Sequence, residues 1–533
     1  MAGALAFLDA HRRLVVGGFL GIVLLAGLLA FRDYGIAWDE PVQRQYGSEV
    51  YGFVAHHDQA LFSDRHRYYG PVFELVLYSL EKAFGLADTR SVYLMRHLVS
   101  YLTLWLGAFF LYLLGARLFK DWKIGLVGGI FLVLSPRIFA HAFYNTKDIP
   151  FMAMFTVGVY TMLRYLDTRA VARAVVHGVV CGLLIDIRIV GVMLAALTLG
   201  FWVLDAARES RRNVASLVAY LAATGCVMVL LWPTLWKDPV GGVVRSFADM
   251  GSFPWEATVM YLGKYVWSTR LPWHYTPVWI GVSTPLAYLV LIGVGMVVCV
   301  RALVEGMAGR GRETGGKGVK GVSPLCGLSG RDATVLLVWS LLPLVYFPAS
   351  RAVLYDEWRH SFFTYPALLL IALAGLVWLW RWVARMPGGV PARIASAALI
   401  FLLALSLGST ATFMIRHHPF QNVYFNSLVG GTHGASGKFE LDYWGLSYRQ
   451  GLEHLVATDR SPRITVFSAH PPGRYNADIL KPADRKRIVY VPDPAEARYQ
   501  ITNFRWEANR PRREGEVFAV EVSGVKLMAV YAM

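Results

Sequence analysis

Long apolar runs recur along this chain and constrain its fold more than any other feature. Each run approaches the ~20 residues that a helix needs to cross a bilayer. About eleven can be counted, at residues 14–30, 92–114, 124–142, 149–166, 174–186, 191–204, 214–235, 277–300, 334–347, 362–380 and 394–414. With 56% hydrophobic and 17% charged residues, the chain does not read as a soluble protein. The sequence predicts an α-helical polytopic membrane protein with about eleven transmembrane helices.

The basic residues predict how these helices are oriented. Alternate loops, counted from the N-terminus, are rich in Lys and Arg, and the longest contains a Gly- and Lys-rich linker at 309–330. Cytoplasmic loops of membrane proteins carry such an excess. We therefore expect a cytoplasmic N-terminus and, after an odd number of spans, a periplasmic C-terminal part. This placement accounts for the net charge of +16 without a nucleic-acid partner.

The two ends of the chain differ in character. The first apolar run is too long for a signal peptide and lacks a small-residue cleavage site, so we expect it to remain as an anchor. Beyond residue 415 the apolar runs shorten to strand length, at 464–467, 488–491, 517–522 and 526–530, with a helix near 448–456. The sequence thus predicts a transmembrane module over 1–414 and a small extracytoplasmic α/β domain over 415–533.

Two neighbouring acids, Asp39 and Glu40, open the long first outer loop, which covers residues 32–90. Carboxylates are costly near hydrocarbon and are usually kept there for a function. We predict that this pair is catalytic, with one carboxylate taking a proton from an acceptor hydroxyl. The alternative is structural, since Asp39 could cap a helix that starts near Pro41.

Several basic side chains lie near the predicted outer ends of the spans. We expect Arg96, Lys147, Arg137 and Arg359 to bind a donor phosphate, because a cation stabilises a departing phosphate anion and Arg suits phosphate geometry. The competing interpretation for Arg96 and Arg137 is a buried ion pair with a loop acid. For Lys147 it is a side chain that extends to the membrane surface.

Other polar residues fall beside these cations. Asp148, His360 and Tyr69 are candidates for positioning the sugar or the acceptor. Asp186 and Arg188 are expected to form a mutual or inter-helix salt bridge. The histidine spacing fits no zinc pattern and the four cysteines suggest neither zinc nor a disulfide framework, so no metal site is predicted, although a divalent metal stays open.

Six short stretches carry a resemblance to a known family. They are Ala-Trp-Asp-Glu at 37–40, Tyr-Leu-Met-Arg at 93–96, Asn-Thr-Lys-Asp-Ile-Pro-Phe at 145–151, Tyr-Asp-Glu-Trp-Arg-His at 355–360, Asn-Val-Tyr-Phe-Asn at 422–426 and Glu-Leu-Asp-Tyr-Trp-Gly at 440–445. From about residue 14 to 448 the chain resembles the GT-C membrane glycosyltransferases. It is most similar to the bacterial family-39 proteins related to protein O-mannosyltransferases and lipid A aminoarabinose transferases.

This resemblance implies a polyprenyl-phosphate sugar as donor, transfer on the outer face and inversion at the anomeric carbon. It implies that Asp39 is the catalytic acid/base and that Glu40 supports it, while Arg96 matches an arginine that the mannosyltransferases need. No cofactor is required. The chain lacks a β-trefoil insertion, and it has Tyr69-Gly70-Pro71 where the aminoarabinose enzymes have Lys-Pro-Pro. The acceptor is therefore left open among a protein, a lipid and a glycan.

Three other functions compete with this hypothesis. A flippase or transporter of a polyprenyl-linked glycan would place polar residues at the membrane midplane and broken helices in matching positions of two halves. The sequence suggests neither feature. An oligosaccharide ligase would use a pyrophosphate-linked donor, and a scaffold subunit would not need Asp39.

Overall fold

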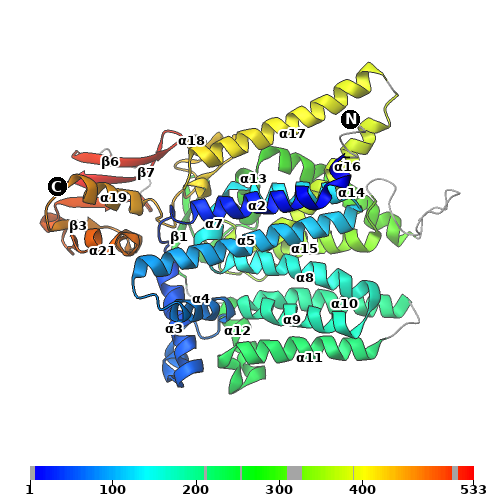
Figure 1. The fold of residues 1–533 in the computed structure, drawn as a ribbon, viewed down its shortest axis with the longest axis horizontal. Coiled ribbons are helices and arrows are strands. Elements are labelled where there is room, and N and C mark those ends of the chain that lie inside the picture. Colours follow the sequence, from blue (N-terminus) through cyan, green and yellow to red (C-terminus); the bar gives the residue numbers. More distant parts are fainter. Residues whose placement is uncertain (1–6, 209–212, 252–254, 309–326, 388, 507–513) are drawn as a thin grey trace.

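The computed structural model describes residues 7–208, 213–251, 255–308, 327–387, 389–506 and 514–533. A long bundle of helices carries a small sheet domain at one end (Figure 1). The first helix begins at the end of the bundle away from the sheet, and the chain ends within the sheet domain. The two ends of the chain therefore lie at opposite ends of the molecule.

Within the described residues, eight helical segments are long and apolar enough to cross a membrane. They are α2 (Arg12–Ala30), α5 (Thr89–Phe119), α8 (Asp148–Thr168), α11 (Val214–Leu231), α14 (Leu286–Met307), α15 (Gly330–Ala349), Arg359–Ala384 with α16 (Tyr365–Ala384), and α17 (Val390–Arg416). The shorter α9 (Val171–Ile187) runs beside α11, and α10 (Val192–Arg208) contacts α8 and α9 (Figure 1). All eleven predicted runs are helical, and the number that crosses the membrane stays a prediction.

Two predicted spans are not continuous helices. The run 124–142 is divided into α6 (Trp122–Val133) and α7 (Pro136–Tyr144), which meet at 67°. Pro136 causes this break, because proline cannot donate the helical hydrogen bond and clashes with the preceding turn. The run 277–300 is likewise divided at Pro285, between α13 (Tyr275–Ser283) and α14. The expectation of unbroken helices was wrong here.

Other helices lie outside the bundle proper. The helix α3 (Glu40–His56) runs across the direction of the bundle (Figure 1), and α4 (Val72–Ala83) packs against it. The helix α12 (Pro239–Gly251) follows α11 and lies at the same end of the bundle as α3 and α4 (Figure 1).

Glycines bring the bundle helices close together. An added Cβ at Gly295 of α14 would lie 1.8 Å from the carbonyl oxygen of Ile371 in α16. A Cβ at Gly375 would meet the Leu291 carbonyl oxygen at 2.3 Å. Helices in membranes associate through such small residues, because lipid supplies no hydrophobic driving force between them.

The C-terminal domain contains a five-stranded sheet in the order β4-β3-β5-β7-β6. Its strands are β3 (Ile464–Ser468), β4 (Ile488–Tyr490), β5 (Tyr499–Thr502), β6 (Glu516–Val522) and β7 (Val525–Ala532). The central β3 is parallel to both neighbours, while β7 is antiparallel to β5 and β6. The helices are α19 (Tyr448–Thr458), α20 (Pro471–Tyr475) and α21 (Pro482–Arg485). Four strands and α19 were predicted, whereas the short, half-polar β5 was missed.

The segment 417–447, which includes α18 (Gly431–Ala435), lies against the helices rather than in the sheet. Its Asn426 donates from Nδ2 to the carbonyl oxygens of Gly281 and Thr284, both at 2.7 Å. A separate hairpin of β1 (Thr258–Tyr261) and β2 (Lys264–Trp267) touches this segment through a bridge from Tyr261 to Phe439. The segment therefore joins the bundle to the C-terminal sheet domain.

Candidate active site

Asp39 lies at the N-terminal end of α3 with its side chain 31% exposed. It occupies the capping position, but its side chain makes no capping hydrogen bond. Its Oδ2 instead lies 3.4 Å from Nη1 of Arg359 and 3.9 Å from Nζ of Lys147. The structural alternative therefore does not account for this carboxylate, which is directed toward two cations.

Arg359 is almost completely buried, at 1% exposure, among acids and rings. Besides Asp39, its guanidinium lies 3.4 Å from Asp148 and 3.7 Å from Asp356. It also lies over the rings of Tyr355 and Trp444, with its Cζ 4.8 and 4.9 Å from their centroids. Rings and carboxylates together hold a guanidinium in one orientation.

Lys147 immediately precedes α8, and its Nζ lies 5.3 Å from the ring centroid of Tyr69. Burial lowers the pKa of Lys147 below that of an ordinary lysine, although the Asp39 carboxylate opposes this effect. The structure thus brings Tyr69 and Lys147 together on one side of Asp39.

Asp148 is the buried partner of two arginines. It pairs with Arg188 and Arg359 and accepts a hydrogen bond from Nδ2 of Asn145 at 2.9 Å. The inter-helix salt bridge predicted for Arg188 is therefore present. Asp186 was expected to take part in such a bridge, and this was wrong. Its carboxylate is buried, and neither oxygen has a hydrogen-bond partner among the described residues.

Glu40 is turned away from these cations. It is 1% exposed, accepts a hydrogen bond from the amide of Ala37 at 2.8 Å, and lies 3.2 Å from Nε2 of His97. Consecutive residues of a helix point about 100° apart, which separates the two acids. These contacts fit a role in holding the loop that carries Asp39.

Arg96 and Arg137 both lie in buried ion pairs. Arg96 binds Glu74 of α4 at 2.6 Å. Arg137 pairs with Glu357 and lies over the ring of Phe425, 4.4 Å from its centroid. These pairs correspond to the competing interpretation of the two residues, while Arg359 and Lys147 are the cations next to Asp39.

His360 packs its ring against Tyr355, with centroids 4.9 Å apart. Two residues of the same loop, Asp356 and Glu357, have φ of +55° and +63°. Side chains other than glycine seldom adopt this conformation, and such strain gathers at functional sites. Arg505 and Arg137 hold these two acids in place.

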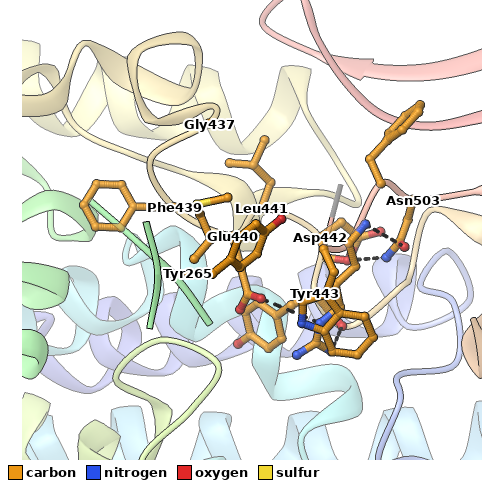
Figure 2. A pocket seen from close by; sticks show the side chains of 12 residues that line it. Tyr265, Gly437, Phe439, Glu440, Leu441, Asp442, Tyr443 and Asn503 are labelled. Carbon is orange, nitrogen blue, oxygen red and sulfur yellow. Dashed lines mark hydrogen bonds and ion pairs between the residues drawn. The ribbon is translucent and has the colours of Figure 1, made fainter. Parts of the chain in front are cut away.

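Arg505, which follows β5 in the C-terminal sheet domain, was not predicted from the sequence. It donates to Asp356 at 2.6 Å, lies 3.7 Å from Glu440 and covers the ring of Trp38 at 5.0 Å. No local signal marks it, because it is one of several basic residues in a polar loop. It lines a pocket with Glu440, Asp442, Tyr443 and Asn503, whose side chains are shown in Figure 2.

Within the described part of the chain, no group of three or more His, Cys, Asp or Glu side chains is arranged to hold a metal ion.

Comparison with known proteins supports the predicted resemblance. The family model for dolichyl-phosphate-mannose-protein mannosyltransferase matches residues 70–236. A comparison with curated protein sequences found no significant match. The structure of ArnT from Cupriavidus metallidurans bound to undecaprenyl phosphate is 14% identical and superposes with a TM-score of 0.51, covering 98% of each chain.

An oligosaccharyltransferase from Archaeoglobus fulgidus, tethered to an acceptor peptide containing the NVT sequon, is 11% identical, with a TM-score of 0.51. The match covers 94% of this chain and 70% of that one. At these identities the likeness shows the fold. The chain has the GT-C fold, with eight candidate membrane-spanning segments among the described residues and a small C-terminal sheet domain.

Proposed function

We propose that this chain, which has the fold of the GT-C glycosyltransferases, moves a sugar from a polyprenyl-phosphate donor to an acceptor. The transfer takes place on the outer, periplasmic face of the membrane and inverts the anomeric carbon. The N-terminus is cytoplasmic and the C-terminal domain extracytoplasmic, as the loop charges suggest. The family match and the lipid phosphate bound by ArnT support this class of donor.

The proposal rests mainly on one observation: the partly exposed carboxylate of Asp39 faces both Arg359 and Lys147. A phosphate monoester that leaves the sugar departs as an anion, and fixed cations stabilise the charge that develops on it. In the protein alone Asp39 is one of the anions that balance these cations, together with Asp148 and Asp356 beside Arg359. An entering donor phosphate would compete for them and release Asp39 to act on the acceptor.

In this mechanism Asp39 takes the proton of the acceptor hydroxyl as its oxygen attacks the anomeric carbon. The bond from that carbon to the phosphate oxygen breaks on the opposite side of the sugar, which inverts the configuration. Arg359 and Lys147 hold the departing lipid phosphate. Asp148 keeps Arg359 in place, and Tyr69 and His360 border the sugar. Glu40 supports the loop of Asp39 through Ala37 and His97.

The test uses purified protein, radiolabelled polyprenyl-phosphate mannose and a membrane extract as the source of acceptor. We expect wild type to transfer the label and Asp39→Asn to be at least about 100-fold slower, as for loss of a general base. Asp33→Asn is the matched control, because this nearby acid is 49% exposed and its carboxylate pairs with His418. It should retain wild-type turnover.

Three results would redirect the assignment. Full activity of Asp39→Asn with bound donor would exclude this residue as the base. Turnover with pyrophosphate-linked oligosaccharides alone would identify a ligase. Movement of a lipid-linked glycan across liposomes, with no sugar transfer, would identify a flippase.

A further inference from the structure

We propose that the pocket between the β1–β2 hairpin and the loop after β5 is the acceptor subsite, and that it takes a carbohydrate. This inference rests on the proposed function, since it names the acceptor of the same reaction. The pocket is partly open to solvent, and its cavity volume is about 40 Å³. Its walls come from the hairpin, from residues 437 and 439–443, and from residues 503–506 of the outer domain (Figure 2).

A short series of contacts joins this pocket to Asp39. Arg505, on the pocket wall, holds Asp356, and Asp356 lies 3.7 Å from Arg359. Arg359 in turn faces Asp39. Arg505 also covers Trp38, the residue before Asp39. An acceptor bound in the pocket would therefore be linked to the proposed base through Arg505, Asp356 and Arg359.

Two buried polar groups on the pocket wall are not fully satisfied. Glu440 and Arg505 are 8% and 7% exposed, and their nearest charged atoms are 3.7 Å apart, which is too long for a hydrogen bond. Neither Oε1 of Glu440 nor Nε of Arg505 has a hydrogen-bond partner among the described residues. Buried groups of this kind are usually satisfied, and one acceptor beside one donor suits a ligand hydroxyl.

The rim of the pocket adds flat apolar surface. Tyr265 of β2 and Trp506 of the outer domain are 36% and 39% exposed there. Aromatic rings offer a large apolar face together with a polar edge. A sugar ring has the matching character, with C–H groups on its faces and hydroxyls around its edge.

The charges and the strand pairing argue against other occupants. Glu440 and Asp442 line the pocket beside Arg505, and Arg505 is already paired with Asp356, so it is not free to bind an anionic lipid headgroup. An extended peptide would bind most simply by adding a strand to the hairpin. The edge of β1 is already bridged to Phe439 at Tyr261. The pocket therefore favours a neutral carbohydrate.

Saturation-transfer NMR with methyl α-D-mannoside tests the pocket without any donor. We expect signal transfer from wild type and from Asp39→Asn, and at least about tenfold weaker binding to Tyr265→Ala and Glu440→Ala, the loss of roughly one good hydrogen bond or ring contact. Trp273→Ala is the control, because this exposed aromatic lies outside the pocket. Equal binding by all variants, or binding of a Gly-Ser-Thr peptide instead of the sugar, would overturn the proposal.

A kinetic experiment separates this inference from the proposed function. Tyr265→Ala should raise the KM for the acceptor extract, because it removes a ring at the rim of the pocket, whereas Trp273→Ala should leave both the acceptor KM and mannose release to water unchanged. An unchanged acceptor KM would count against the subsite. If wild type cleaves no polyprenyl-phosphate sugar but binds the mannoside at Tyr265, the proposed donor fails while the carbohydrate pocket stands.

Discussion

Arg505 donates a hydrogen bond to Asp356 at 2.6 Å, although the two residues are 149 positions apart in the chain. The outer sheet domain thereby reaches the loop that carries Arg359. Asp356 receives Arg505 on one oxygen and lies near Arg359 with the other. The sheet domain is therefore part of the candidate active site and more than a cover over it.

Replacing Arg505 should slow catalysis. Arg505→Ala leaves Asp356 buried without its main partner, which costs several kcal/mol when one member of a buried pair is removed. We expect kcat for sugar transfer to fall ten- to 100-fold. Lys526→Ala, which disturbs an ion pair on the surface of the same domain, should keep wild-type kcat. Normal turnover by Arg505→Ala would show that the outer domain does not position Arg359.

Arg359→Lys should weaken binding of the lipid phosphate. Lysine keeps the charge but loses the planar group that stacks on Tyr355 and Trp444. We expect the Kd for polyprenyl phosphate to rise at least tenfold in a binding assay with detergent-solubilised protein. Arg351→Lys, an exposed position that precedes the same loop, is the control and should bind normally. Equal affinity of the two variants would remove Arg359 from the phosphate site.

Lys147 predicts an alkaline limit to donor binding. Its pKa is lowered mainly by burial, so the cation is present at low pH and is lost as pH rises through a value below that of ordinary lysine. We expect the donor KM to increase on the alkaline side in wild type. Lys147→Arg should remain charged and shift this increase to higher pH. An identical pH profile for the two proteins would contradict the assignment.

Glu440 predicts a change of stability with pH. Burial raises its pKa to about 7 from an ordinary value of 4.5. Between these values the folded protein binds more protons than the unfolded chain, so its contribution to stability falls as pH rises toward 7. Thermal unfolding in detergent should show a smaller decrease of Tm from pH 5 to 8 in Glu440→Gln than in wild type. Parallel curves would mean that Glu440 is charged throughout.

The glycine contact between α14 and α16 predicts a difference in stability between two neighbouring positions. Gly295→Ala places a methyl group 1.8 Å from a backbone carbonyl, so the helices must separate, at a cost of about 1–3 kcal/mol or more. Gly293→Ala meets nothing within 4 Å and improves helix propensity. We expect a lower Tm for the first variant and an unchanged or higher Tm for the second.

Most secondary structure could be predicted from the sequence, because the signals are local. Each of the eleven apolar runs of spanning length falls on helix in the described structure, and short runs marked four of the five strands of the C-terminal sheet. The breaks at Pro136 and Pro285 could also have been predicted, since proline disrupts a helix wherever it falls in the interior. They were missed because a hydropathy value averaged over a whole apolar run hides the effect of a single proline.

The sequence by itself determined that acids and cations collect near the ends of the apolar runs, and it singled out Asp39, Lys147 and Arg359. Only the tertiary structure decided which of them meet. It pairs Arg96 and Arg137 with Glu74 and Glu357, turns Glu40 away from Asp39, and brings Arg505 from the far end of the chain. The physical reason is that hydropathy and charge are properties of neighbours in sequence. Which charges pair depends on side-chain direction and on packing between distant segments. Local composition predicts neither of these.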